Sequence, residues 1–205
     1  MIPKHIQNHL EHLKAIGQFR ELKNYGKGID FFSNDYLGLG KNFVEVIHQD
    51  LNWGSTGSRL ISGNHHYYEQ LEDFLSQWFK KTALIFGSGY MANLGVLSSI
   101  PTRHDTILYD SLCHASLKDG IRLSLAKSYP FPHNNYEKLE NLIKNSSGDV
   151  YVVVESVYSM DGDSPHPEIL KSLVNKYGIY LIIDEAHSFG ICGGRRKRLD
   201  TTKSS

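Results

Sequence analysis

The stretch VYVVVESVYSMDGDSPHPEILKSLVNKYGIYLIIDEAH (residues 150–187) decides the fold class of this chain. It places two strongly apolar runs, VYVVVES (150–156) and YLIIDEAH (180–187), on either side of the helical pattern PEILKSLVNKYG (167–178). Apolar runs without strict alternation are typical of parallel strands buried on both faces, and a helix between them supplies the crossover. The stretch therefore predicts a strand–helix–strand unit of an α/β fold.

The same alternation of helices and strands continues toward the N-terminus. In chain order, apolar spacing predicts a helix over residues 5–23, a helix through 71–79, strand ALIF (83–86), a helix through MANLGVLSS (91–99), strand TILY (106–109), a helix over about 114–125 and a helix through 139–143. We expect a mostly parallel sheet flanked by helices.

Composition and charge exclude several classes of function. The 205 residues carry a net charge of zero, and no long basic run precedes residue 195, so the electrostatic pattern of a nucleic-acid binder is missing. The sequence shows no signal peptide and no run of eighteen apolar residues, so we expect a cytoplasmic protein that is not embedded in a membrane. Cys113 and Cys192 have no C-x-x-C partner, and we expect neither a disulfide framework nor a metal site.

Ligands of parallel α/β sheets lie beyond the carboxyl ends of the strands. Two short segments that follow predicted strands are candidates for such a ligand site. Gly87-Ser88-Gly89-Tyr90 follows strand ALIF and opens a helix, so its free N–H groups could receive a phosphate. An ordinary glycine-rich turn is the alternative. His114, after strand TILY, either brings an imidazole to the same edge or only caps the next helix.

Two further segments end the apolar strands with polar groups. Glu155 and Ser159 follow the first of them, where Asp161 and Gly162 could alternatively form a simple turn. Asp184 follows the second, and such an acid could bind magnesium in a nucleotide triphosphatase, but no G-x-x-x-x-G-K-[ST] loop is present. The better explanation is a carboxylate that pairs with a protonated pyridinium nitrogen.

Taken together, the motifs resemble the α-oxoamine synthase family of pyridoxal-phosphate enzymes. The six motifs, in order, are SNDYLGL (33–39), GSTGSRLISG (54–63), FGSGYMANLG (86–95), DSLCHASLKDGIRLS (110–124), ESVYSMDGD (155–163) and IIDEAHSFG (182–190). The resemblance implies the large domain of a fold-type-I pyridoxal-phosphate enzyme that works as a homodimer.

The same resemblance assigns roles to single residues. Ser88, Gly89 and Tyr90 match the segment that holds the cofactor phosphate, and His114 matches the histidine that stacks on the pyridine ring. Asp184 matches the partner of the ring nitrogen, and His187 matches the partner of the ring oxygen. Glu155 and Ser159 match residues of the cofactor pocket, and Asn34 matches the residue that contacts the amino-acid carboxylate. The implied reaction removes an α-proton or carboxyl group from an amino acid, with alanine expected. The resulting carbanion then attacks an acyl-CoA or acyl carrier protein thioester.

The end of the sequence departs from the family. After Gly193 the family continues with further strands, the Schiff-base lysine and a smaller domain, whereas this chain reads GRRKRLDTTKSS (194–205). We expect an N-terminal helix and turn over 1–30, a partial cofactor-binding domain over 31–193 and an aberrant or disordered tail over 194–205. The chain alone would then be inactive. The alternatives are a family enzyme that acylates glycine and a noncatalytic remnant.

Overall fold

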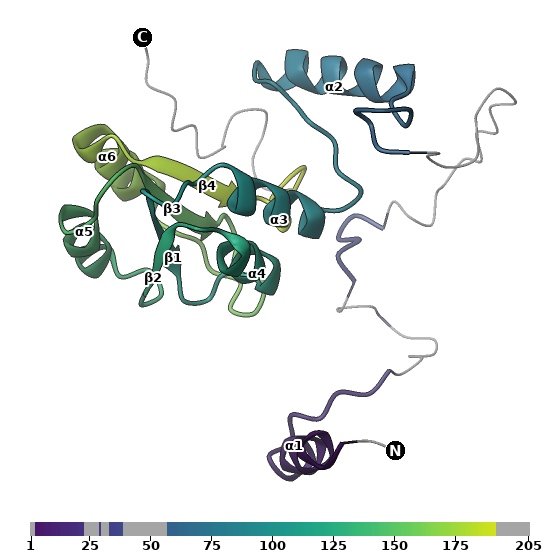
Figure 1. Cartoon of the computed structure of the whole chain (residues 1–205), viewed down its shortest axis with the longest axis vertical. Coiled ribbons are helices and arrows are strands. Elements are labelled where there is room, and N and C mark those ends of the chain that lie inside the picture. The colour runs from purple at the N-terminus through teal and green to yellow at the C-terminus, as the bar shows by residue number, and fades with distance from the viewer. Residues whose placement is uncertain (1–2, 23–28, 30–32, 39–56, 192–205) are drawn as a thin grey trace, which may run out of the picture. The chain divides into compact units, whose positions relative to one another are not determined.

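The computed structural model describes residues 3–22, 29, 33–38 and 57–191 (Figure 1). The chain divides into two compact units, residues 1–43 and residues 44–205. In the first unit, helix α1 (Lys4–Ala15) confirms the predicted lead helix, but it ends earlier than expected. Gly17 adopts a left-handed conformation with φ 69° directly after the helix, which a residue without a side chain tolerates and which stops the helical path.

The second unit is built on one parallel sheet of four strands in the order β2-β1-β3-β4. The strands are β1 (Thr106–Asp110), β2 (Lys127–Phe131), β3 (Val150–Glu155) and β4 (Tyr180–Asp184). All three pairings are parallel, so the carboxyl ends of the strands lie at one edge of the sheet. The α/β class with a parallel sheet is confirmed.

Helices cover both faces of this sheet. In the described part of this unit, residues 57–191, the helices are α2 (His66–Phe79), α3 (Gly89–Ser99), α4 (Ala115–Leu123), α5 (Tyr136–Lys144) and α6 (Pro167–Tyr177). Helices α3 and α4 pack on one face through Leu97 and Leu117, and α5 and α6 pack on the other through Leu139 and Leu170 (Figure 1).

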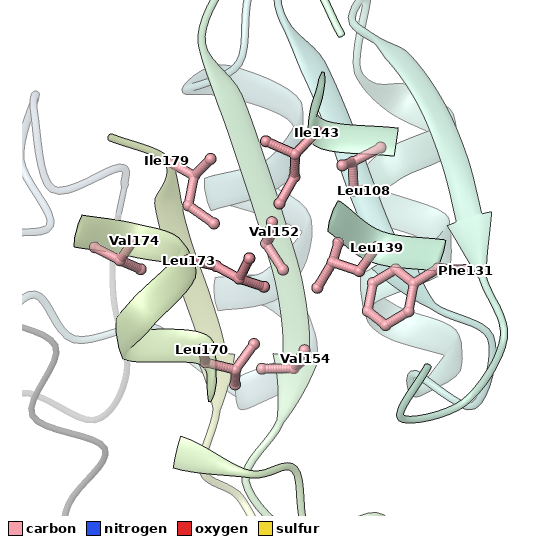
Figure 2. Close-up of a cluster of buried hydrophobic side chains, with 10 residues drawn as sticks. All are labelled: Leu108, Phe131, Leu139, Ile143, Val152, Val154, Leu170, Leu173, Val174 and Ile179. Carbon is pink, nitrogen blue, oxygen red and sulfur yellow. The ribbon is translucent and has the colours of Figure 1, made fainter. Parts of the chain in front are cut away.

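The central strand β3 shows why helices must cover the sheet on both faces. Successive side chains of a strand point to opposite faces. Val152 and Val154 therefore join the core under α5 and α6, while Tyr151 and Val153 join the core under α3 and α4. Figure 2 shows the first of these cores, with Val152 and Val154 of β3 facing Leu139 and Leu170. An all-apolar strand has no face that could be left in water.

One predicted strand is wrong. Residues 83–86 follow α2 but form no strand within the described part of the chain. Side chains of α2 occupy their backbone donors: the Ala83 N–H donates to the Ser76 hydroxyl at 2.9 Å and the Ile85 N–H to Glu72 at 2.8 Å. Arg59 holds Glu72 in place with hydrogen bonds of 2.5 and 2.9 Å. The apolar run ALIF is thus tied to a helix and not to a neighbouring strand.

The sequence also failed to predict strand β2. Its residues KSYPF are exposed except for Phe131, and Pro130 removes one backbone donor, so no apolar run marks the segment. Proline is tolerated because a strand at the edge of a sheet bonds on one side only. Pairing with β1 along five residues creates this strand.

Three smaller features complete the description of the fold. Cys113 is a buried free thiol, and Cys192 lies outside the described residues. His65 caps α2, because its imidazole accepts a hydrogen bond from the Tyr67 N–H. None of the described helices combines the length and the apolar character needed to cross a lipid bilayer.

Candidate active site

The polar residues singled out from the sequence gather at the carboxyl edge of the sheet. Glu155 ends β3 and Asp184 ends β4, and the two are paired in the strand register. Burial raises the pKa of Glu155 above its ordinary value, and the nearby charge of Asp184 acts in the same direction. The fold therefore concentrates acidic groups where parallel α/β sheets bind their ligands.

Helix α3 begins at this edge with an open N-terminus. Ser88 is its N-cap, and the serine hydroxyl accepts a hydrogen bond from the Met91 N–H at 3.2 Å. The N–H groups of Gly89 and Tyr90 have no hydrogen-bond acceptor among the described residues. A Cβ added to Gly89 would meet nothing within 4 Å. These features form a small cradle of free donors at the positive end of a helix, which suits a phosphate group.

His114 lies at the start of α4, with its ring exposed. It is the N-cap residue, as the structural alternative predicted, because the Ser116 N–H donates to its Nδ1 at 3.2 Å. Its own backbone N–H donates to the buried Glu155 carboxylate at 2.5 Å. The ring of Tyr90 meets the ring of His114 edge to face, with 6.4 Å between their centroids. Capping the helix and presenting an exposed ring are thus compatible roles.

The half-buried carboxylate of Asp184 is held on both of its oxygens. The Ala186 N–H donates to Oδ1 at 2.9 Å, and the Asn93 side-chain amide donates to Oδ2 at 2.7 Å. Asn93 also donates to the Ser116 hydroxyl at 2.9 Å, which in turn lies 2.8 Å from Nδ1 of His114. Asp184 and His114, which the sequence placed 70 residues apart, are therefore connected through two intervening side chains.

The remaining predicted residues lie outside the helices and strands. His187 lies in the turn after β4 and is partly buried, while Ser159 is exposed in the turn after β3. In that turn the Gly162 N–H donates to the Tyr158 carbonyl at 2.8 Å, and Gly162 has φ 71°, so the predicted turn is present. Asn34 is exposed and belongs to the first unit.

Sequence reasoning assigned no role to three side chains that organise this edge. Asn93 and Ser116 connect Asp184 with His114, and the hydroxyl of Ser156 lies 3.1 Å from the Asp184 carbonyl and 2.6 Å from the Ser188 hydroxyl. Asn93 lies one helical turn after the glycine-rich segment, inside the motif FGSGYMANLG. A polar side chain in an otherwise apolar helix was the available signal.

A second polar cluster surrounds His133, which follows β2. Nδ1 of His133 lies 2.9 Å from the fully buried Asp110 carboxylate, and Nε2 lies 2.8 Å from Asp163. Burial by itself would lower the pKa of His133, but the hydrogen bonds to both acids raise it above its ordinary value. His133, Asp161 and Asp163 could be grouped as metal ligands by distance, but both ring nitrogens of His133 already lie within hydrogen-bonding distance of a carboxylate.

The family model of aminotransferase class I and II matches residues 26–202 of this chain. A relative from Halalkalibacterium halodurans, provisionally named 8-amino-7-oxononanoate synthase, is 42% identical over 92% of this chain and 52% of its own length. The chain thus spans about half the length of the curated relatives it matches.

Solved structures show the same relationship. The 8-amino-7-oxononanoate synthase of Francisella tularensis superimposes with a TM-score of 0.62 at 31% identity, covering 82% of this chain and 48% of that one. A structure of serine palmitoyltransferase with pyridoxal phosphate gives a TM-score of 0.66 at 31% identity, covering 78% of this chain and 40% of that one.

Proposed function

The chain belongs to the aminotransferase class I and II family and, within it, to the α-oxoamine synthases, and we propose that it binds pyridoxal phosphate to join an amino acid to an acyl thioester. One observation supports this proposal most directly. The exposed ring of His114 and the carboxylate of Asp184 are connected by hydrogen-bonding contacts through Asn93 and Ser116, close to the N-terminus of α3.

The donor set at this edge fits the cofactor. The free N–H groups of Gly89 and Tyr90, with Ser88, would hold the phosphate, and the cradle at Gly89 leaves room for it. Asn93 follows Gly89 by four residues, about 6 Å along the helix axis, so Asp184 is held one turn beyond the phosphate end. A carboxylate there can accept a hydrogen bond from a protonated pyridine nitrogen. When bound, pyridoxal phosphate supplies an electron sink for a carbanion formed on the amino acid.

Residues of this chain then orient and enclose the reacting groups. Asp184 is fixed on both oxygens, so its direction toward a ring nitrogen does not depend on the ligand. Glu155 holds the main chain of His114 through its N–H, and the His114 ring would cover one face of the cofactor. We assign His187 to the ring oxygen, Ser159 to the pocket wall and Asn34 to the amino-acid carboxylate.

The finer proposal is an 8-amino-7-oxononanoate synthase that uses alanine and an acyl-CoA or acyl carrier protein thioester in biotin biosynthesis. Its support is the 42% identity to a relative provisionally given that name. The structural likeness to a serine palmitoyltransferase favours serine as the competing substrate, and glycine acylation is a further alternative. We also propose a cytoplasmic homodimer, with residues 31–193 as the partial cofactor domain.

We propose, in addition, that the 205-residue chain alone does not turn over. The cofactor aldehyde needs an amine held within bonding distance, and none of the lysines of this sequence stands in the family's lysine motif. Borohydride reduction followed by mass spectrometry tests this. A single stoichiometric pyridoxyl adduct on one lysine, together with release of CoA from an acyl-CoA, would contradict it.

Cofactor binding is the direct test of the site. We expect calorimetric titration of the chain with pyridoxal phosphate to show saturable binding that inorganic phosphate weakens. Asp184→Asn removes the charge that pairs with the ring nitrogen and should weaken binding about tenfold, the equivalent of ~1.4 kcal/mol. Asp73→Asn, on the exposed surface of α2, is the matched control and should bind like the parent.

Two outcomes would count against the proposal. If the parent chain does not bind pyridoxal phosphate, the site is not a cofactor site. If Asp184→Asn and Asp73→Asn bind equally well, Asp184 does not face the ring nitrogen. Free thiol released from several acyl-CoA compounds, measured with alanine, serine and glycine in turn, would identify the amino-acid substrate of any turnover.

A further inference from the structure

Asn93 lies on the second turn of α3, between the open start of the helix and the buried Leu97. The two hydrogens of its amide nitrogen serve two different acceptors, Oδ2 of Asp184 at 2.7 Å and the hydroxyl of Ser116 at 2.9 Å. These acceptors come from β4 and from α4, 91 and 23 residues away in the sequence. One side chain of α3 therefore joins three separate elements at the edge of the sheet.

Ser116 contacts the His114 ring with both its backbone N–H and its hydroxyl. Nδ1 of His114 accepts the Ser116 backbone N–H at 3.2 Å. The Ser116 hydroxyl, which accepts from Asn93, also lies 2.8 Å from Nδ1. Hydrogen-bonding contacts thus connect the Asn93 amide with the imidazole through Ser116.

We propose that Asn93 is a positioning residue of the cofactor site, which sets Asp184 against the ring nitrogen and His114 against the ring face as one unit. The inference rests on the proposed function, because it gives Asn93 the task of positioning Asp184 and His114, the two residues proposed to contact the cofactor ring. An amide suits this role because it donates twice from one nitrogen and does not titrate. A flipped amide would point its oxygen at the Asp184 carboxylate, so the orientation is determined.

The packing of α3 against α4 makes this reach possible. Gly120 of α4 lies so close to α3 that a Cβ on it would meet the carbonyl oxygen of Asn93 at 2.8 Å. Ser116 is 1% exposed and lies one turn before Gly120. The absence of a side chain at Gly120 brings the two helices close enough for the Asn93 amide to meet the Ser116 hydroxyl. The Ser116 end of this bond is buried, which limits competition from water.

The experiment compares two ligands, pyridoxal phosphate and its 1-deaza analogue, in which carbon replaces the ring nitrogen. The analogue keeps the phosphate and the ring faces but cannot pair with Asp184. Dissociation constants of both ligands are measured by calorimetry on the parent chain, Asn93→Leu and Asn93→Ala. Ser116→Ala breaks only the branch to His114, and Ser98→Ala, an exposed residue of α3 whose hydroxyl bonds to the Leu94 carbonyl, is the control.

We expect the preference for pyridoxal phosphate over the analogue to fall about tenfold in both Asn93 variants and to stay unchanged in Ser116→Ala and Ser98→Ala. Ser116→Ala should weaken both ligands equally, because it frees the ring of His114 and leaves Asp184 in place. A merely structural role of Asn93 would weaken both ligands alike, so an unchanged preference in the Asn93 variants overturns the inference.

Failure of the proposed function gives a different result. A parent chain that binds neither ligand, or that binds both equally, removes the ring-nitrogen pairing and this inference with it. A parent that prefers pyridoxal phosphate while the Asn93 variants keep that preference overturns only the role of Asn93. The smaller Asn93→Ala variant supplies the result if leucine prevents folding, and circular dichroism verifies that each variant is folded.

Discussion

Replacing Gly120 by alanine tests how closely α3 and α4 must approach. Gly120 lies in the interior of α4, and an added Cβ would meet the Asn93 carbonyl oxygen at 2.8 Å, the Leu97 Cβ at 3.0 Å and the Leu94 Cα at 3.2 Å. Two of these three atoms belong to the backbone of α3. To restore an ordinary contact of 3.4 Å from 2.8 Å, the helices must separate by about 0.6 Å.

The expected change in stability is a difference of two opposing effects. Alanine in place of glycine favours a helix by about 1 kcal/mol. Forcing an extra methyl group into a close-packed interface costs roughly 1–3 kcal/mol, and the upper part of this range applies when backbone has to move. We therefore expect Gly120→Ala to lower the free energy of unfolding by about 1–2 kcal/mol.

Gly95→Ala is the matched control, because Gly95 lies inside α3 and gains the same helix preference. Its Cβ would meet the Phe86 ring at 3.1 Å, but Phe86 is 38% exposed and can turn aside. We expect Gly95→Ala to raise the free energy of unfolding by about 0.5–1 kcal/mol. Urea unfolding followed by far-ultraviolet circular dichroism measures both variants. A Gly120→Ala variant as stable as Gly95→Ala would refute the argument that this glycine sets the distance between the helices.

Two further predictions concern pH. Because its hydrogen bonds to Asp110 and Asp163 raise the pKa of His133, the charged imidazole stabilises the fold at pH values below 6.5, and this contribution is lost as pH rises through the folded pKa. His133→Leu should therefore lower the free energy of unfolding by about 2 kcal/mol at pH 6 and by less at pH 8.5. If urea unfolding gives an equal loss of stability at both pH values, the charge of His133 does not stabilise the fold. The pKa of Glu155 is also raised, here by burial, so the fold loses stability as pH rises above 4.5 and the carboxyl group ionises. Glu155→Gln keeps an acceptor for the His114 N–H and should be more stable than the parent at pH 8; an unfolding midpoint lower than that of the parent would contradict this.

The fold class could be predicted from the sequence because a buried parallel strand consists of consecutive apolar residues. Val152, Val153 and Val154 follow one another without a polar residue, and only a strand covered on both faces accommodates such a run. The polar residues that end these strands, Glu155 and Asp184, were identified for the same reason, since an abrupt change in polarity marks the edge of the sheet. Both features depend on neighbours in the sequence.

The errors arose where the decisive hydrogen-bond partners lie outside the segment itself. The run at residues 83–86 has the composition of a strand, but Ser76 and Glu72 occupy its backbone donors. The segment KSYPF has no strand composition, yet it becomes β2 because β1 offers it unpaired backbone groups. The local hydrophobicity of a segment does not determine which acceptor its backbone N–H groups will bind.

The sequence by itself determined the parallel α/β class, the order of its main elements and the family to which the six motifs point. Only the tertiary structure decided that Asn93 joins Asp184 to Ser116 and that His133 bridges Asp110 and Asp163. Periodicity and strand-end polarity arise between residues a few positions apart, so a sequence displays them directly. The hydrogen bond between Asn93 and Asp184, 91 positions apart, exists only after the sheet has formed, and the bond between Asn93 and Ser116 needs the close approach of two helices that Gly120 permits.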